Sequence, residues 1–222
     1  MKKIVILLAL FLITGCFPQN YDKKLKNSII ELAGVKNGEN YHEISDSNST
    51  LYHNLKYDYE SNEFEILAWD DEKEMEIYVQ KATDVYTVYF HSEEVNSWFK
   101  VITSEEDLDS LDLGIIKNFI KDPNYSVFLS YESYEKVSDT KYRLKFTDKT
   151  FIEQISGVSP DVTELEFDFI FEGDHIKEIH FEFETVDGYF LKSKTIINST
   201  NDYKFSVPDD IKNNAIEVDL TN

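Results

Sequence analysis

The sequence is poor in cysteine, glycine, proline and basic residues. One Cys in 222 residues excludes internal disulfides and a cysteine-based zinc site. Seven Gly and four Pro exclude collagen-like and low-complexity chains. The 22 Lys and Arg against 43 Asp and Glu give a formal charge of −21, which excludes a nucleic-acid-binding protein that works by neutralising phosphates.

Apolar and aromatic side chains, in contrast, are abundant. Hydrophobic residues make up 41% of the chain and aromatic residues 14%, which is enough for one sizeable core. Intrinsic disorder is therefore not expected. No linker or block of charge divides residues 21–222, so we expect a single domain there.

The first twenty residues carry the most specific pattern. Lys2 and Lys3 form a positively charged start, and residues 4–13 are an uncharged apolar run of ten. As a helix this run would span roughly 15 Å, about half of a ~30 Å bilayer core. It is too short for a stable transmembrane helix and has the length of the apolar part of a signal peptide. The end of this run overlaps the sequence Leu12-Ile13-Thr14-Gly15-Cys16, in which the only cysteine follows two small residues.

This segment resembles the lipobox of bacterial lipoproteins. The resemblance implies that the Cys16 thiol receives a diacylglyceryl group and that residues 1–15 are removed as a signal peptide. Residues 16–20 would be the lipidated cysteine and a short tether. We expect the lipid to hold the protein on the extracytoplasmic face of the cell membrane, because two acyl chains anchor stably. The mature charge, 20 − 43 = −23, would be repelled by an anionic membrane surface. The alternative is an ordinary secretory signal with an incidental cysteine.

Two or three amphipathic helices are expected in the body of the chain. Helical spacing of apolar residues predicts the first over residues 21–35, with Asp22 able to cap its start and Gly34 able to close its end. Residues 103–106 match a capping box that begins with Thr103, and the helix that follows should end at Asp122-Pro123. Residues 151–156 are a candidate for a short third helix.

Period-two alternation predicts ten or eleven strands in the remainder. They fall within residues 40–102, 125–146 and 165–207, and the last group includes a strand over 203–207. Asp187-Gly188 is typical of a two-residue type I′ hairpin turn. Further turns are expected at Ser61-Asn62, Asp70-Asp71, Ala82-Thr83 and Ser92-Glu93.

An open sheet of this size tends to curl, which leaves an apolar concave face to be covered. The expected fold class is therefore α+β: a curled, mostly antiparallel sheet in the form of a half-barrel, covered by the amphipathic helices. The order of elements resembles the LolA/LppX-type lipoproteins. The resemblance rests on the lipobox, the helix after it, the Ser97-Trp98-Phe99-Lys100 strand before the second helix, and residues 205–212. It implies a half-barrel whose helices plug its mouth and whose cavity holds acyl chains, and it implies no catalytic residue.

Four phenylalanines, Phe167, Phe169, Phe181 and Phe183, alternate with polar residues and are the candidate ligand-cavity residues. They could equally fill a closed core. No catalytic residue is predicted, because residues 157–160 lack the second glycine of a nucleophile elbow. No cofactor and no metal site are expected, because none of the five histidines stands in an H-E-x-x-H pattern. His53 is expected in the core or cavity and His175 in solvent.

Together these patterns predict a membrane-anchored, non-catalytic bacterial lipoprotein that binds a hydrophobic or lipidic ligand in a half-barrel cavity. One alternative is an envelope interaction or sensor domain with a filled core, which would bind a protein partner through its acidic faces. A second alternative is a hydrolase of unrecognised type. No nucleic-acid partner is expected, and the sequence identifies no protein partner.

Overall fold

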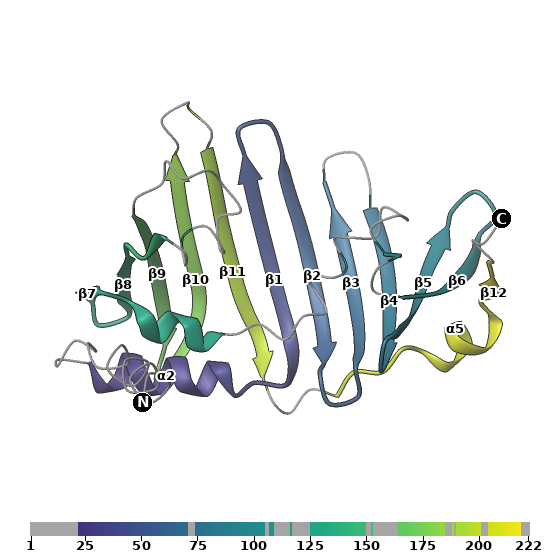
Figure 1. Ribbon diagram of the computed structural model, residues 1–222, viewed down its shortest axis with the longest axis horizontal. Helices are drawn as coiled ribbons and strands as arrows, with labels where there is room; N and C mark the ends of the chain where they lie inside the picture. The colour runs from purple at the N-terminus through teal and green to yellow at the C-terminus, as the bar shows by residue number, and fades with distance from the viewer. Residues whose placement is uncertain are drawn as a thin grey trace, which may run out of the picture.

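The computed structural model describes residues 22–70, 74–104, 107–108, 116, 125–149, 152, 164–184, 188, 190–200 and 204–218. The predicted signal peptide, Cys16 and the tether lie outside these residues, as do most of the second predicted helix and of residues 151–156. The described residues form one sheet of 12 strands in the order β12-β6-β5-β4-β3-β2-β1-β11-β10-β9-β8-β7 (Figure 1).

Two meanders build this sheet. The first comprises β1 (Asn37–Asp46), β2 (Thr50–Asp58), β3 (Glu63–Trp69), β4 (Glu74–Ala82), β5 (Val85–Ser92) and β6 (Ser97–Ser104). The second comprises β7 (Ser133–Ser138), β8 (Lys141–Phe146), β9 (Leu165–Glu172), β10 (His175–Glu184) and β11 (Phe190–Thr200). They join through antiparallel pairing of β1 with β11, and among the described strands only the short β12 (Ile216–Glu217) pairs in parallel, with β6. The expected sheet-dominated α+β class is confirmed, with twelve strands instead of ten or eleven.

The first predicted helix is confirmed as α2, Lys23–Ala33. The Asp22 carboxylate caps it by accepting hydrogen bonds from the backbone N–H groups of Lys24, at 2.8 Å, and Leu25, at 3.2 Å. Gly34 follows as the C-terminal cap. The helix buries Leu25, Ile29 and Leu32, whereas Ile30 is 49% exposed.

The 3₁₀ helix η3 (Tyr125–Ser130) lies with α2 against one face of the sheet, which we call the inner face (Figure 1). The prediction of a strand that begins at residue 125 was wrong over this segment. The ring of Phe128 packs against those of Phe167 and Phe169 at 5.0 Å each, so this end of the inner face is a filled aromatic core. Leu108, Ile116 and Ile152 belong to the same core.

The predicted capping box is described only in part, since Glu105 and Glu106 lie outside the described residues. Thr103 is part of β6, and the hydroxyl of Ser104 accepts a hydrogen bond from the Asp107 backbone N–H at 3.3 Å. The same hydroxyl donates to the Asp107 carboxylate at 2.6 Å. The described hydrogen bond to a backbone N–H is therefore made by Ser104, where the pattern had predicted Thr103.

The C-terminal segment packs on the opposite face, which we call the outer face. Phe205, Val207 and Ile211 form a second apolar cluster with Tyr78 and Tyr89. The predicted strand over residues 203–207 was wrong: residues 204–208 have no regular structure, and α5 (Asp209–Asn214) follows. The backbone N–H of Val207 donates to the Glu63 carboxylate at 2.6 Å, where a strand would have paired with backbone.

Some of the predicted turns are confirmed. Asn62 and Thr83 both have φ of 57° at the β2–β3 and β4–β5 connections, which Asn tolerates better than most residues. In the β10–β11 connection, Asp187 of the predicted two-residue turn lies outside the described residues, and the last described pair of the ladder is Glu184 with Phe190. Gly188 has φ of +84° within it.

Candidate functional site

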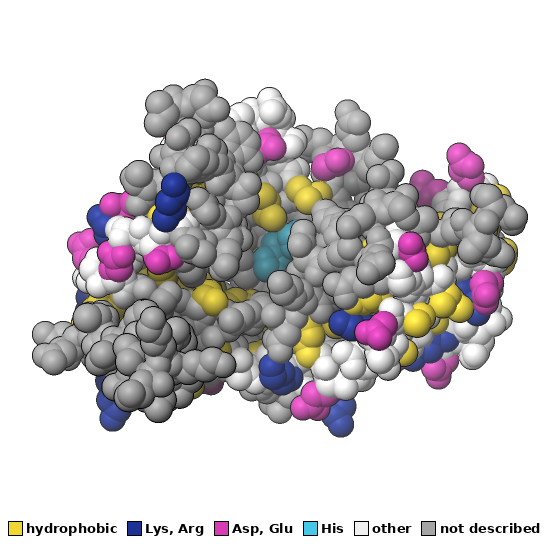
Figure 2. Space-filling model, viewed as in Figure 1, with side chains coloured by type: hydrophobic (Ala, Val, Ile, Leu, Met, Phe, Trp, Pro, Cys, Tyr) yellow, Lys and Arg dark blue, Asp and Glu magenta, His cyan; other side chains and the backbone are white. Residues whose placement is uncertain are grey.

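A row of cross-strand neighbours on the inner face changes from apolar to polar at the middle of the sheet. The row runs Tyr142, Phe169, Ile179, Thr195, His42, His53, Ala68 and Met75, from β8 to β4. Its polar members lie on β11, β1 and β2, where the two meanders meet. Figure 2 shows histidine side chains near the centre of this side of the molecule, beside hydrophobic ones.

Two imidazoles and a hydroxyl are in direct contact there. The rings of His42 and His53 are stacked, with centroids 4.4 Å apart and an interplanar angle of 17°. Nδ1 of His42 lies 3.0 Å from the Thr195 hydroxyl oxygen, within hydrogen-bonding distance. His53 is only 2% exposed, whereas His42 and Thr195 are half-buried, so one side of the group is accessible.

Both imidazoles are held in the neutral form. Burial lowers the pKa of His42 to about 4. Burial, together with the neighbouring His42, lowers the pKa of His53 to about 3. A neutral imidazole offers one N–H donor and one nitrogen acceptor, so at pH 7 the pair is a hydrogen-bonding surface without charge.

Asn40 lies on the same face of β1, two residues before His42. Its cross-strand neighbours, Leu55 and Ile197, are both buried core residues. Asn40 is 2% exposed, and its side-chain oxygen has no hydrogen-bond partner among the described residues. A buried acceptor without a donor costs about 1–3 kcal/mol, so a donor bound to this oxygen would be stabilising. We call Asn40, His42, His53 and Thr195 the inner polar site.

The inner polar site is better suited to binding than to metal or proton chemistry. Stacked, nearly parallel imidazoles direct their in-plane lone pairs side by side, so they do not converge on one ion as zinc ligands do. No group of three or more His, Cys, Asp or Glu in the described part of the chain could hold a metal. His42 and Thr195 have the contact of a base and a hydroxyl, but a base with a pKa of about 4 is weak at neutral pH.

Three of the four candidate cavity residues are buried. Phe167 and Phe169 lie in the filled core under Phe128, and Phe183 is also a core residue. Phe181 is half-buried, with its ring centroid 5.1 Å from that of Phe167 and 6.4 Å from that of Phe183. Phe181 begins another inner row that continues with Ser193, Ile44 and Leu51, and the last two are half-buried apolar residues beside the inner polar site.

On the central strands, charged side chains lie at the positions that point to the outer face, except at the end of β1. The inner-facing residues of β11, β1, β2 and β3 include no Lys, Arg or Glu, and the single Asp among them, Asp46, is the last residue of β1. Its carboxylate accepts hydrogen bonds from the backbone N–H groups of Asn48 and Ser49, at 2.8 and 2.9 Å, in the turn. The middle of the inner face is therefore apolar with one uncharged polar group.

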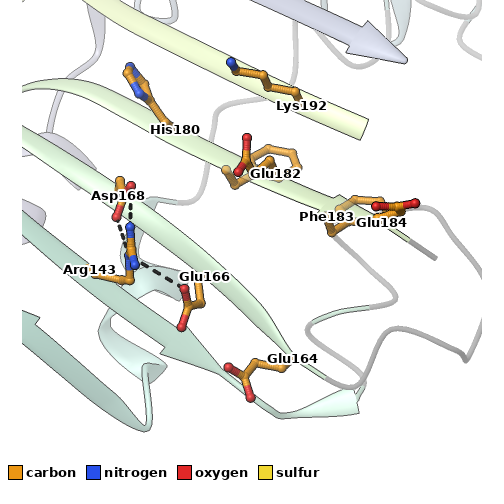
Figure 3. A pocket seen from close by; sticks show the side chains of 10 residues that line it. Arg143, Glu164, Glu166, Asp168, His180, Glu182, Phe183, Glu184 and Lys192 are labelled. Carbon is orange, nitrogen blue, oxygen red and sulfur yellow. Dashed lines mark hydrogen bonds and ion pairs between the residues drawn. The ribbon is translucent and has the colours of Figure 1, made fainter. Parts of the chain in front are cut away.

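A charged cleft of about 560 Å³ lies over β8–β11 (Figure 3). The Arg143 guanidinium binds the Asp168 carboxylate through two hydrogen bonds, of 2.8 and 3.1 Å. Burial alone would raise the pKa of Asp168, but hydrogen bonds from Arg143 and Lys141 outweigh it, so this pKa lies below its usual value. Two lining residues are basic and five are acidic: Arg143, Lys192, Glu164, Glu166, Asp168, Glu182 and Glu184.

The sequence patterns had indicated His53 as an inner residue, which is confirmed, and His175 as solvent-exposed, which is also confirmed. His175 additionally pairs with Glu31, whose carboxylate lies 3.0 Å from its Nδ1. Asn40, His42 and Thr195 were not singled out. Their common feature, an uncharged polar side chain at an inward position of a strand, is visible only when the strand register is known.

No protein-family model and no curated protein matches the sequence. Among solved structures, the fold is similar to an uncharacterized conserved protein from Thermus thermophilus, with 11% identity and a TM-score of 0.38. That match covers 88% of this chain and 96% of the other. No helix among the described residues has the length and hydrophobicity needed to cross a membrane.

Proposed function

We propose that this chain is a bacterial lipoprotein, anchored through a diacylglyceryl group on Cys16 at the extracytoplasmic face of the membrane, and that it binds a hydrophobic or lipidic ligand on the inner face of its sheet. The function is binding, without catalysis. In this proposal the sheet acts as a half-barrel that is closed at its β7–β10 end by the aromatic core and open toward its centre.

The observation that carries this proposal is the contrast between the two halves of the inner face. Under η3 the phenylalanines are fully packed, with Phe169 0% exposed. Toward the centre, the half-buried Phe181, Ile44 and Leu51 continue the apolar surface in the row next to a polar group that has no charge. An uncharged, partly accessible apolar surface suits acyl chains, because contact with them removes apolar area from water without burying an ion.

Extraction of bound lipid from the full chain tests the proposal. The protein is purified from membranes in mild detergent, and non-covalent lipid is extracted with organic solvent and quantified, while covalently attached chains stay on the protein. We expect lipid in near-stoichiometric amount with wild type. Phe181→Glu should lose it and still melt cooperatively, because the new carboxylate would lie at a half-buried position.

Ile102→Glu is the matched control, since Ile102 lies on β6 and is 53% exposed. It should leave the lipid content unchanged. Wild-type protein without extractable lipid, together with a Phe181→Glu variant that does not fold, would overturn the proposal and favour a filled core. If the glutamate variant does not fold although the wild type carries lipid, Phe181→Ala provides the second measurement.

A second candidate function, an interaction domain for a protein partner, is favoured by the charged cleft. Glu182, Glu184 and Lys192 line it and are all exposed. Five acidic against two basic lining residues would favour a cationic partner surface. Cross-linking in intact cells, compared between wild type and Glu182→Lys/Glu184→Lys, would detect such a partner.

A further inference from the structure

We propose that the inner polar site, formed by Asn40, His42, His53 and Thr195, selects an uncharged headgroup that carries a hydroxyl, such as the glycerol of a monoacylglycerol. This inference rests on the proposed function and adds which class of amphiphile the inner face binds. The acyl chain would lie along the half-buried apolar residues next to the site, and the headgroup at the junction of β11, β1 and β2.

The side-chain oxygen of Asn40 requires a donor. It is buried and lacks a partner among the described residues, while the side chains opposite it across the ladders, Leu55 and Ile197, offer none. A hydroxyl or amide N–H would satisfy it. A phosphate or an ionised carboxylate has only acceptors to offer and would leave it unsatisfied.

The stacked histidines add a further hydrogen-bonding nitrogen to the same patch. His42 is the half-buried member of the stack, and its Nδ1 is engaged by Thr195, which fixes the ring relative to β11. Its other ring nitrogen then has the complementary role, donor or acceptor, that the tautomer dictates. A hydroxyl fits either tautomer, because it both donates and accepts.

The surroundings disfavour an ionised headgroup. The inner-facing positions of the four central strands provide no Lys or Arg to balance an anion, and Asp46 at the strand end would oppose one. Burying an unpaired charge costs far more than burying a hydrogen-bonded hydroxyl. The next inward row of the sheet runs Phe181, Ser193, Ile44 and Leu51. Its members other than the buried Ser193 are apolar and would contact the chain of the amphiphile.

The test compares three ligands that share one acyl chain: 1-monooleoylglycerol, methyl oleate and oleate. Each is added to the delipidated full-length protein in mild detergent at pH 7, and binding is measured by native mass spectrometry. We expect wild type to bind the monoacylglycerol about tenfold more tightly than methyl oleate, the effect of one hydrogen bond to a buried acceptor. Oleate should bind more weakly than the monoacylglycerol.

Asn40→Leu should reduce this preference to near unity and leave methyl oleate binding in place. Asn54→Leu is the matched control: the same substitution on β2, at a residue whose amide donates to Glu39 at 2.7 Å and which lies on the outer face. It should keep the tenfold preference. His42→Phe keeps a stacked ring and provides a second variant if Asn40→Leu does not fold.

The two proposals fail in different ways. If wild type binds none of the three ligands, the lipid-binding function itself is wrong. If it binds all three without preference, or binds oleate most tightly, lipid binding stands and the headgroup inference is overturned. An Asn40→Leu variant that retains the full tenfold preference would also overturn it.

Discussion

The buried histidine pair should make the folded domain sensitive to mild acid. In the unfolded chain both imidazoles titrate near pH 6.5, whereas in the folded protein the pKa values of His42 and His53 are about 4 and about 3. Between these limits the unfolded state binds more protons than the folded state. The free energy of unfolding therefore falls as the pH drops from about 6.5 toward 4, and is restored as the pH rises.

The size of the effect follows from these pKa values. Between pH 7 and pH 5 each imidazole contributes roughly 2 kcal/mol, so the pair gives at most roughly 4 kcal/mol. Carboxylates with lowered pKa values, such as Asp22 and Asp168, lose their contribution at lower pH, near and below their usual pKa. The contribution of the histidines to the free energy of unfolding can therefore be separated from that of the carboxylates by the pH range in which it changes, as well as by mutation.

Urea unfolding followed by circular dichroism at pH 5, 6, 7 and 8, at constant ionic strength, measures the effect. We expect the double variant His42→Phe/His53→Phe to lose most of the stability difference between pH 7 and pH 5. His175→Gln is the control, because that side chain is 71% exposed and should leave the pH dependence unchanged. Parallel loss of stability in wild type and the double variant would refute the assignment of two buried neutral histidines.

Three further predictions concern the anchor and the framework. Cys16→Ala should abolish labelling by a radioactive fatty acid and lead to accumulation of the uncleaved precursor; equal labelling of wild type and variant would refute the lipobox. Gly188→Val should destabilise the protein by about 1–3 kcal/mol, because φ of +84° strains a β-branched residue, and Gly188→Asn should cost less; thermal melting compares them. Asp22→Ala should cost about 1 kcal/mol or more, measured by urea unfolding, because α2 loses its cap and the Tyr142 hydroxyl loses an acceptor at 2.9 Å.

Local patterns predicted the parts of the fold that local chemistry determines. Asp22 and Gly34 delimit α2 because capping depends on residues within one turn of the helix end. The prediction that His53 lies in the core or cavity was correct, and Leu55 and Tyr57 are buried on the same side of β2. The capping box was predicted to begin at Thr103, but Thr103 belongs to β6 and Ser104 makes the hydrogen bond to the Asp107 backbone, because the extent of β6 is not visible in the local pattern.

The wrong predictions share another cause, which is contact with distant parts of the chain. Residues 125–130 alternate like a strand, yet Phe128 is held in a 3₁₀ helix by packing on Phe167 and Phe169, about forty residues away. Residues 204–208 alternate as well, but their apolar side chains cover the outer face of the first meander. Alternation indicates that one side is buried and leaves open whether backbone pairing accompanies it.

The inner polar site could not be predicted for a related reason. His42 opposes His53 only in the register set by the turn after Asp46, and Thr195 reaches His42 only when β11 pairs with β1. A one-residue shift would turn either side chain to the opposite face. The four phenylalanines were found because they stand in one strongly alternating stretch. The site beside them is assembled from three segments, none of them distinctive in isolation.

The junction of β1 with β11 has a consequence for the order of folding. Within each meander, neighbouring strands are close in sequence, so their loops close cheaply, but the contact between His42 and Thr195 spans 153 residues. We therefore expect each meander to form its own hairpins first, and the junction to form last and to open first. In the free protein, backbone amides of the β1–β11 ladder should then exchange hydrogen faster than those of the β2–β3 ladder, and this difference would test the expected order. A ligand bound across the junction would then act as a clamp between two semi-independent halves, slowing their separation without contacting most of either.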